Sequence, residues 1–137
     1  MTEQSPRDII HLPPDGGRRY AMGALTAIFK ADGAETGEAY SASEWVLDPG
    51  QPRVGAHRHD DNVEIFLVLE GIPEFLLGDT WTPCPAGTFL RIPAGVTHDF
   101  RNEGQRLARF FSMFLGGGFE RNMPAIVDWF AKQEPPP

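Results

Sequence analysis

The sequence has little positive charge and no long apolar run. Its 12 lysines and arginines stand against 19 acidic residues, a formal net charge of -7. Nucleic-acid binding depends on clustered cations, so we expect no nucleic-acid partner. No stretch reaches the roughly 20 apolar residues of a membrane span, and the first residues lack the apolar core of a signal peptide. We therefore expect a soluble, cytoplasmic protein without membrane association.

Cysteine is nearly absent as well. The single cysteine, Cys84, excludes an intramolecular disulfide and fits a reducing compartment. It lies between two prolines in WTPCPAG. We expect a buried thiol there rather than a nucleophile.

Glycine and proline, by contrast, are abundant, with 15 and 13 residues spread along the chain. This distribution is typical of short strands joined by many turns. A hydrophobic content of 41%, with ten phenylalanines, supports a packed core. A chain of 137 residues is expected to form one domain, and the pattern predicts an all-β fold.

Three regions follow from the pattern. A polar lead-in occupies residues 1–18, and the strand-like pattern fills residues 19–118. In the C-terminal region, 119–137, Ile126 and Phe130 recur at helical spacing. We predict one short C-terminal helix there, followed by a Pro-rich tail, EPPP, that is disordered.

The segment GAHRHDDNVEIFLVLEG combines two histidines and a glutamate with an apolar run. His57 and His59 are two residues apart, so on an extended chain both point to the same side. Glu64 begins the run and shares a face with Phe66. Two imidazoles and a carboxylate in an apolar interior indicate either metal ligands or a catalytic cluster. The next apolar segment follows Gly71 closely, which predicts a tight hairpin.

A second segment, GTFLRIPAGVTHDFRN, places His98 just after a Pro-Ala-Gly turn. Together the two segments resemble the paired motifs of the cupin superfamily. The matching positions are Gly50, His57, His59, Glu64 and Gly71 in the first motif, and Gly87, Pro93, Gly95, His98 and Asn102 in the second. The one departure is an extra residue between Gly50 and His57, in the loop ahead of the histidines.

The resemblance implies a double-stranded β-helix, a small jelly-roll barrel that holds one divalent transition metal. Carried over by position, the metal ligands are His57, His59, Glu64 and His98. The sequence does not choose among Fe, Mn, Ni, Co and Zn, since all of them accept such a nitrogen and oxygen set. The fourth histidine, His11, lies outside both motifs and receives no role.

The stretch FLGGGFERN resembles a segment of small single-domain cupins described as similar to quercetin 2,3-dioxygenases. This likeness implies a metal-dependent, dioxygenase-type oxidoreductase acting on a small phenolic or enol-type substrate. Glu64 would then be a catalytic base as well as a ligand. A non-catalytic small-molecule-binding or sensing cupin and a metal-dependent isomerase or lyase stay open as alternatives.

The barrel interior next to the metal is expected to be apolar and aromatic. Phe66, Phe75 and Phe100 are expected to form its walls, with Trp45 or Phe111 beside them. The alternative for each of them is a place in the barrel core. Such an interior suits a small organic substrate better than a sugar phosphate.

The strand after the histidine pair is apolar on both faces. Ile65, Leu67 and Leu69 lie opposite the face of Glu64, so the outer side of the strand also needs cover. A partner subunit or the C-terminal helix would have to supply that cover. We therefore expect a homodimer.

Overall fold

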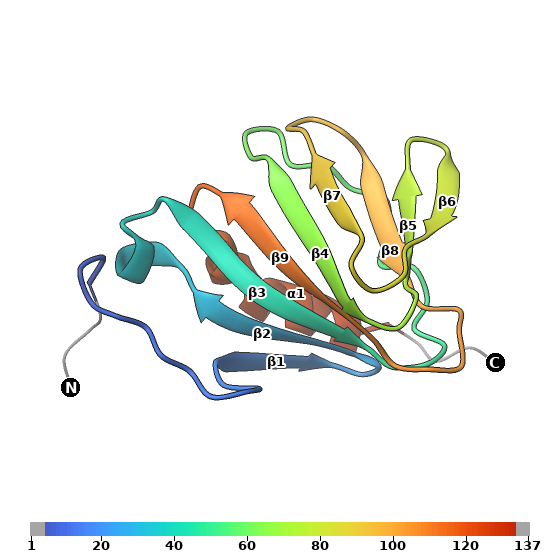
Figure 1. Ribbon diagram of the computed structural model, residues 1–137, viewed down its shortest axis with the longest axis horizontal. Coiled ribbons are helices and arrows are strands. Elements are labelled where there is room, and N and C mark those ends of the chain that lie inside the picture. The colour runs from blue at the N-terminus through green and yellow to red at the C-terminus, as the bar shows by residue number, and fades with distance from the viewer. Residues whose placement is uncertain (1–4, 134–137) are drawn as a thin grey trace.

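The computed structural model describes residues 5–133. Within this range nine strands form two antiparallel sheets that face each other across one core (Figure 1). The predicted all-β fold with a short C-terminal helix, a double-stranded β-helix, is confirmed. The tail predicted to be disordered, at 134–137, lies outside the described residues.

The larger sheet has six strands in the order β1 (Arg18–Met22), β2 (Leu25–Ala31), β3 (Tyr40–Leu47), β9 (Ala108–Leu115), β4 (Glu64–Glu70), β7 (Phe89–Ile92). The smaller sheet has three, in the order β6 (Thr80–Pro83), β5 (Glu74–Leu77), β8 (His98–Arg101). The helical elements are two 3₁₀ turns, η1 (Gly33–Thr36) and η2 (Phe119–Asn122), and the helix α1 (Met123–Ala131). Within residues 5–133, none of the helices has the length and apolar character that crossing a bilayer requires.

Aromatic side chains from both sheets fill the centre of the core. Phe75 on β5 is fully buried, with its ring centroid 4.9 Å from that of Phe66 and 5.2 Å from that of Phe110. Phe100 on β8 approaches Phe110 to 5.0 Å in an edge-to-face arrangement. Such pairs stabilise a core beyond their buried area alone, and here they join the two sheets.

The chain between β4 and β5 changes sheets, so the predicted hairpin is wrong. β4 pairs with β7 and β9, whereas β5 pairs with β6 and β8. Gly71 makes the bend with φ +73°, and a Cβ there would lie 2.4 Å from the carbonyl oxygen of Leu107. Only glycine combines that backbone conformation with so close an approach.

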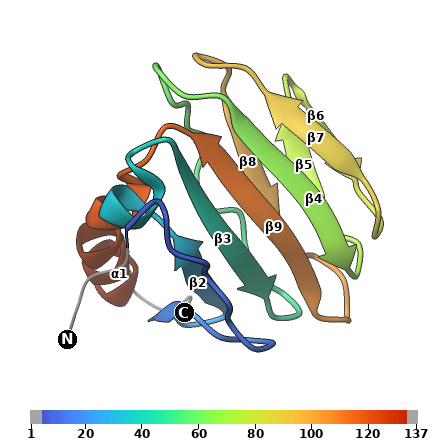
Figure 2. The same cartoon turned by 60° about the vertical axis from the view of Figure 1, so that its left-hand side comes forward.

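Helix α1 lies on the inner side of the larger sheet, behind β3 and β9 in Figure 1 and at the left in Figure 2. Its Met123 is fully buried, and Ile126 and Phe130 pack against the core. The helix therefore does not cover the outer face of β4, where Leu67 and Leu69 are exposed. Either the C-terminal helix or a partner subunit was expected to cover that face. The structure excludes the helix.

Candidate metal centre

Four side chains converge between the sheets. His57, His59, Glu64 and His98 each offer one ligand atom, and these atoms all lie within 4.8 Å of one another. His57 and His59 belong to the loop ahead of β4. Glu64 is the first residue of β4, and His98 is the first residue of β8. The structure thus brings together all four residues expected from the two motifs.

A backbone bridge holds the two motifs together. The N–H of His57 donates to the carbonyl of His98 at 2.9 Å, and the N–H of His98 donates back to the carbonyl of His57 at 2.8 Å. This reciprocal pair fixes two ligands that are far apart in the sequence. Their ring centroids lie 4.5 Å apart as a result.

Backbone carbonyls orient two of the imidazoles. Nδ1 of His57 lies 2.7 Å from the oxygen of Gly55, and Nδ1 of His98 lies 3.0 Å from the oxygen of Val96. A carbonyl oxygen only accepts, so each Nδ1 carries the proton and each Nε2 turns toward the cluster. Metal-ligating histidines are typically held in this way.

The donor set fits a divalent transition metal. At about 2.0–2.1 Å per bond, ligands on opposite sides of such an ion lie about 4 Å apart, in keeping with the 4.8 Å limit of this cluster. Three imidazoles and one carboxylate form a mixed nitrogen and oxygen set that several first-row metals accept. The site therefore has the ligands and the size for one such ion.

The Glu64 carboxylate is buried and held at both oxygens. Ser112 Oγ donates to Oε2 at 2.8 Å, and Nε2 of His98 lies 2.9 Å from Oε1. Ser112 was not predicted from the sequence. It is a small polar residue on an otherwise apolar strand, and that contrast was the available signal.

Burial and charge act differently on two of the histidines. Burial lowers the pKa of His59, and the nearby Glu64 only partly offsets this effect. Burial also opposes the charged form of His98, but its contacts with Glu64 and the Val96 carbonyl outweigh it and raise the pKa. Ligating imidazoles are deprotonated at the metal-facing nitrogen, so a metal ion bound at this cluster would release a proton from His98.

Asp99 is a second residue that the sequence did not single out. Its carboxylate is fully buried and accepts hydrogen bonds from the N–H groups of Val54, Gly55 and Phe100. These bonds hold the loop that carries the first histidine. Asp99 follows His98 directly, so it anchors this loop from the strand that supplies the fourth ligand.

The cluster opens onto a cavity of about 300 Å³ lined by aromatic and aliphatic side chains. Among the residues expected as walls, Trp45, Phe66 and Phe100 line it. Phe75 lies behind the walls, fully buried against Phe66.

Phe111 is not a wall, because β9 alternates and turns this residue to the outer face. Phe110 and Phe114 line the cavity in its place, which corrects the expectation by one position.

Cys84 is buried away from the cavity lining, and burial raises the pKa of its thiol. His11 is exposed in the lead-in.

Comparisons with known proteins agree with this geometry. Residues 43–114 match the Cupin domain family (Cupin_2). Protein SchB of Streptomyces halstedii is 36% identical over 111 residues, which cover 80% of this chain and 77% of SchB.

Solved structures share the fold at low sequence identity. A conserved protein with a double-stranded β-helix domain from Klebsiella pneumoniae gives a TM-score of 0.68 at 20% identity, covering 81% of this chain and 93% of that chain. The polyketide cyclase RemF from Streptomyces resistomycificus gives 0.60 at 22% identity, covering 66% and 64%. With both motifs folded into one ligand cluster and the family match spanning residues 43–114, the chain belongs to the cupin superfamily.

Proposed function

We propose that the protein is a metal-dependent, dioxygenase-type oxidoreductase that acts on a small phenolic or enol-type substrate. One observation carries the proposal: of a cluster of three imidazoles and a carboxylate, His57, His59 and Glu64 line an apolar, aromatic cavity of about 300 Å³. Binding sites for small organic molecules are typically apolar with a few convergent polar groups. Here the convergent polar groups are His57, His59 and Glu64, and His98 completes the cluster behind them.

His57, His59, Glu64 and His98 would hold the metal. A bound divalent metal would supply Lewis acidity toward a substrate hydroxyl, and a redox-active one would also supply an electron path to dioxygen, which Zn does not. Dioxygen is the oxidant and both of its atoms end in the organic product, so the reaction needs no further reductant.

Glu64 would also take the proton of the substrate hydroxyl. The Ser112 hydroxyl donates to Oε2, so the proton would go to Oε1, whose contact with His98 Nε2 would be released when that nitrogen binds the metal. Phe66 and Phe100, which line the cavity, hold the substrate ring and exclude water. Exclusion of water strengthens the electrostatic contacts inside such a site.

The proposal predicts dioxygen consumption that depends on both metal and substrate. Protein loaded separately with Fe, Mn, Ni, Co or Zn would be mixed with a panel of phenols and enols in an oxygen-electrode cell. We expect uptake with a subset of the panel and none with metal-free protein. Isotope-labelled dioxygen should place both labelled atoms in the product.

Two other outcomes would replace the proposal. Conversion of an enol without dioxygen uptake would indicate an isomerase or lyase using the same ligands. Tight binding of a panel compound without conversion under any of the five metals would indicate a binding or sensing module.

We also propose a homodimer formed through the outer face of the larger sheet. Leu67 is 38% exposed, and it pairs with Phe89 on β7, which is 62% exposed, and with Phe111 on β9. This gives one apolar row across three strands on the side opposite α1. A second copy of the chain offers the same row, so two copies cover each other around a two-fold axis.

Light scattering at micromolar concentration should therefore give the mass of two chains. Leu67→Lys should reduce the mass to that of one chain, because a charge would be buried at the centre of the row. Ile9→Lys is the control, since Ile9 is 88% exposed in the lead-in, outside this face. A one-chain mass for the unmodified protein would count against the dimer.

A further inference from the structure

One wall of the cavity is made by residues outside the stretch that matches the cupin domain. That match ends at residue 114. Phe119 from η2 and Ile126, Trp129 and Phe130 from α1 all line the cavity. We call these four residues the C-terminal wall. It faces the ligand residues, and it comes from a later part of the sequence than they do.

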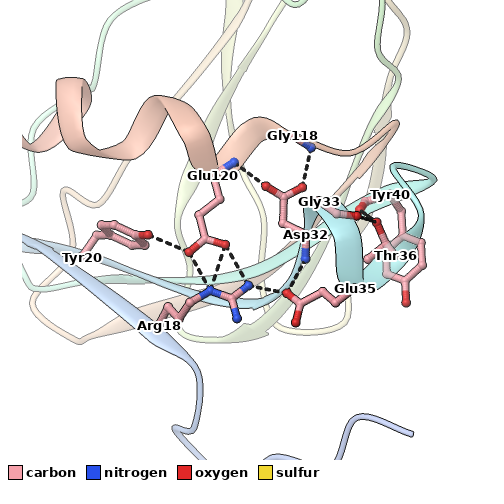
Figure 3. A network of polar contacts seen from close by, with 9 residues as sticks. All are labelled: Arg18, Tyr20, Asp32, Gly33, Glu35, Thr36, Tyr40, Gly118 and Glu120. Atoms are coloured by element: carbon pink, nitrogen blue, oxygen red, sulfur yellow. Dashed lines mark hydrogen bonds and ion pairs between the residues drawn. The ribbon is translucent and has the colours of Figure 1, made fainter. Parts of the chain in front are cut away.

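Polar contacts around the buried Asp32 hold the start of this wall in place (Figure 3). The Asp32 carboxylate, at the end of β2, accepts hydrogen bonds from the N–H groups of Gly118 and Glu120. Glu120 in turn pairs with Arg18 at 2.7 Å and accepts a hydrogen bond from the Tyr20 hydroxyl at 2.6 Å. Strands β1 and β2 thus fix η2, which carries Phe119 and leads directly into α1.

The wall runs from the ligands to the cavity mouth. Phe119 stacks on Phe114 with ring centroids 4.4 Å apart and planes 18° apart, and its ring lies 5.8 Å from that of His59. Trp129 stands at the other end and is 52% exposed although it lines the cavity. Its ring meets Phe130 edge-on at 4.9 Å. The wall therefore presents aromatic surface at both ends, with the aliphatic Ile126 between them in the sequence.

Among the described residues that line the cavity, a charged group of a substrate would meet ionisable side chains only at the ligand cluster. Its aromatic lining residues are Trp45, Phe66, Phe100, Phe110, Phe114, Phe119, Trp129 and Phe130. Among the lining residues of the described chain, the ionisable ones are His57, His59 and Glu64, all three of them in the ligand cluster. A charged group on the substrate away from this cluster would lose its hydration without compensation.

We infer that the C-terminal wall is the specificity-determining element, and that it selects planar, fused aromatic substrates that are uncharged beyond their ligand-facing oxygen. The inference deepens the proposed function, on which it rests for the polar end of the substrate. At the apolar end the selection comes from the wall and does not depend on the oxidation chemistry. Trp129 and Phe130 hold the ring that is farthest from the ligands.

Two probes with the same ring and hydroxyl test this selection. 2-Naphthol is neutral, and 6-hydroxynaphthalene-2-sulfonate carries a charge at the opposite end. Calorimetric titration of metal-loaded and metal-free protein should show naphthol binding, with the sulfonate at least about tenfold weaker. Trp129→Ala and Phe130→Ala should each weaken naphthol binding about tenfold, roughly the loss expected for a buried aromatic contact.

Lys132→Ala is the matched control, because Lys132 is exposed beyond the end of α1 and pairs only with Asp128 among the described residues. Trp129→Phe should restore most of the affinity, and circular dichroism should show that each variant is folded. Wild-type affinity in both alanine variants, equal binding of the two probes, or no naphthol binding to the wild type would overturn the inference.

The same data separate this inference from the proposed function. Wall-dependent naphthol binding without turnover of any phenol would refute the oxidoreductase and leave the wall in place. Dioxygen uptake whose KM for each phenol is unchanged in both alanine variants would refute the wall and leave the oxidoreductase in place.

Discussion

His98→Ala is expected to lower the affinity for divalent metal by more than about 100-fold. Losing only a hydrogen bond that supports a ligand typically costs 10–100-fold in affinity, and here a ligand itself is lost. His98 is almost fully buried, with its Nε2 beside Glu64 Oε1, so no side chain from the surface replaces it readily. Elemental analysis of the purified protein and titration with each metal would measure the loss.

The double variant His59→Ala/His98→Ala should retain only traces of metal. His11→Ala is the control, since that histidine is exposed and lies outside the cluster; it should keep about one metal ion per chain. Full occupancy in the double variant would sink the ligand assignment. Circular dichroism of both variants would show whether the fold survives.

Glu64→Gln is expected to reduce turnover by about 10²–10⁴-fold even when the metal is fully loaded, because an amide does not accept the substrate proton. The amide oxygen can still coordinate a metal, and the Ser112 hydroxyl can turn to accept from the amide NH2 group instead of donating to Oε2, so geometry is largely kept. Single-turnover rates at measured metal content would separate lost catalysis from lost metal.

Asp60→Asn serves as the comparison for this substitution. Asp60 is the nearby carboxylate that pairs with Arg58 at the surface, so its replacement should leave the rate within about twofold, as is usual for surface changes. Near-wild-type rates in metal-loaded Glu64→Gln would rule out the base role and leave Glu64 as a ligand only.

The ligand cluster could be predicted because its signal is local. His57 and His59 are two residues apart, and the spacing of the turn before His98 is equally short-range. Such short spacings can be recognised from the sequence without any knowledge of tertiary contacts. In the folded chain, the reciprocal backbone bridge between His57 and His98 brings the two motifs together.

The aromatic wall from β9 was misplaced for a physical reason. The strand reads ARFFSMFL, with apolar residues on both faces, so alternation alone does not say which face turns inward. Phe110 rather than Phe111 lines the cavity. Which face of β9 turns inward is decided by its pairing with β3 and β4, which are distant in the sequence. The role of Ser112 could not be predicted for the same reason.

The path of the chain after Gly71 and the side on which α1 lies also depended on tertiary packing. A short connection after a glycine is compatible with a hairpin and with a change of sheet. Helical spacing of Ile126 and Phe130 predicts an apolar stripe but not the surface that receives it. Both features matter for function, because together they leave the space in which the cavity lies.

The bridge between His57 and His98 has a consequence for metal exchange at the candidate site. The backbone of these two ligands is already ordered by hydrogen bonds that belong to the fold, so little conformational entropy remains to be lost when an ion enters. A chelator that removes an ion from this site is then expected to leave a folded protein that can be reloaded, and we expect the availability of each metal to help decide which ion is bound.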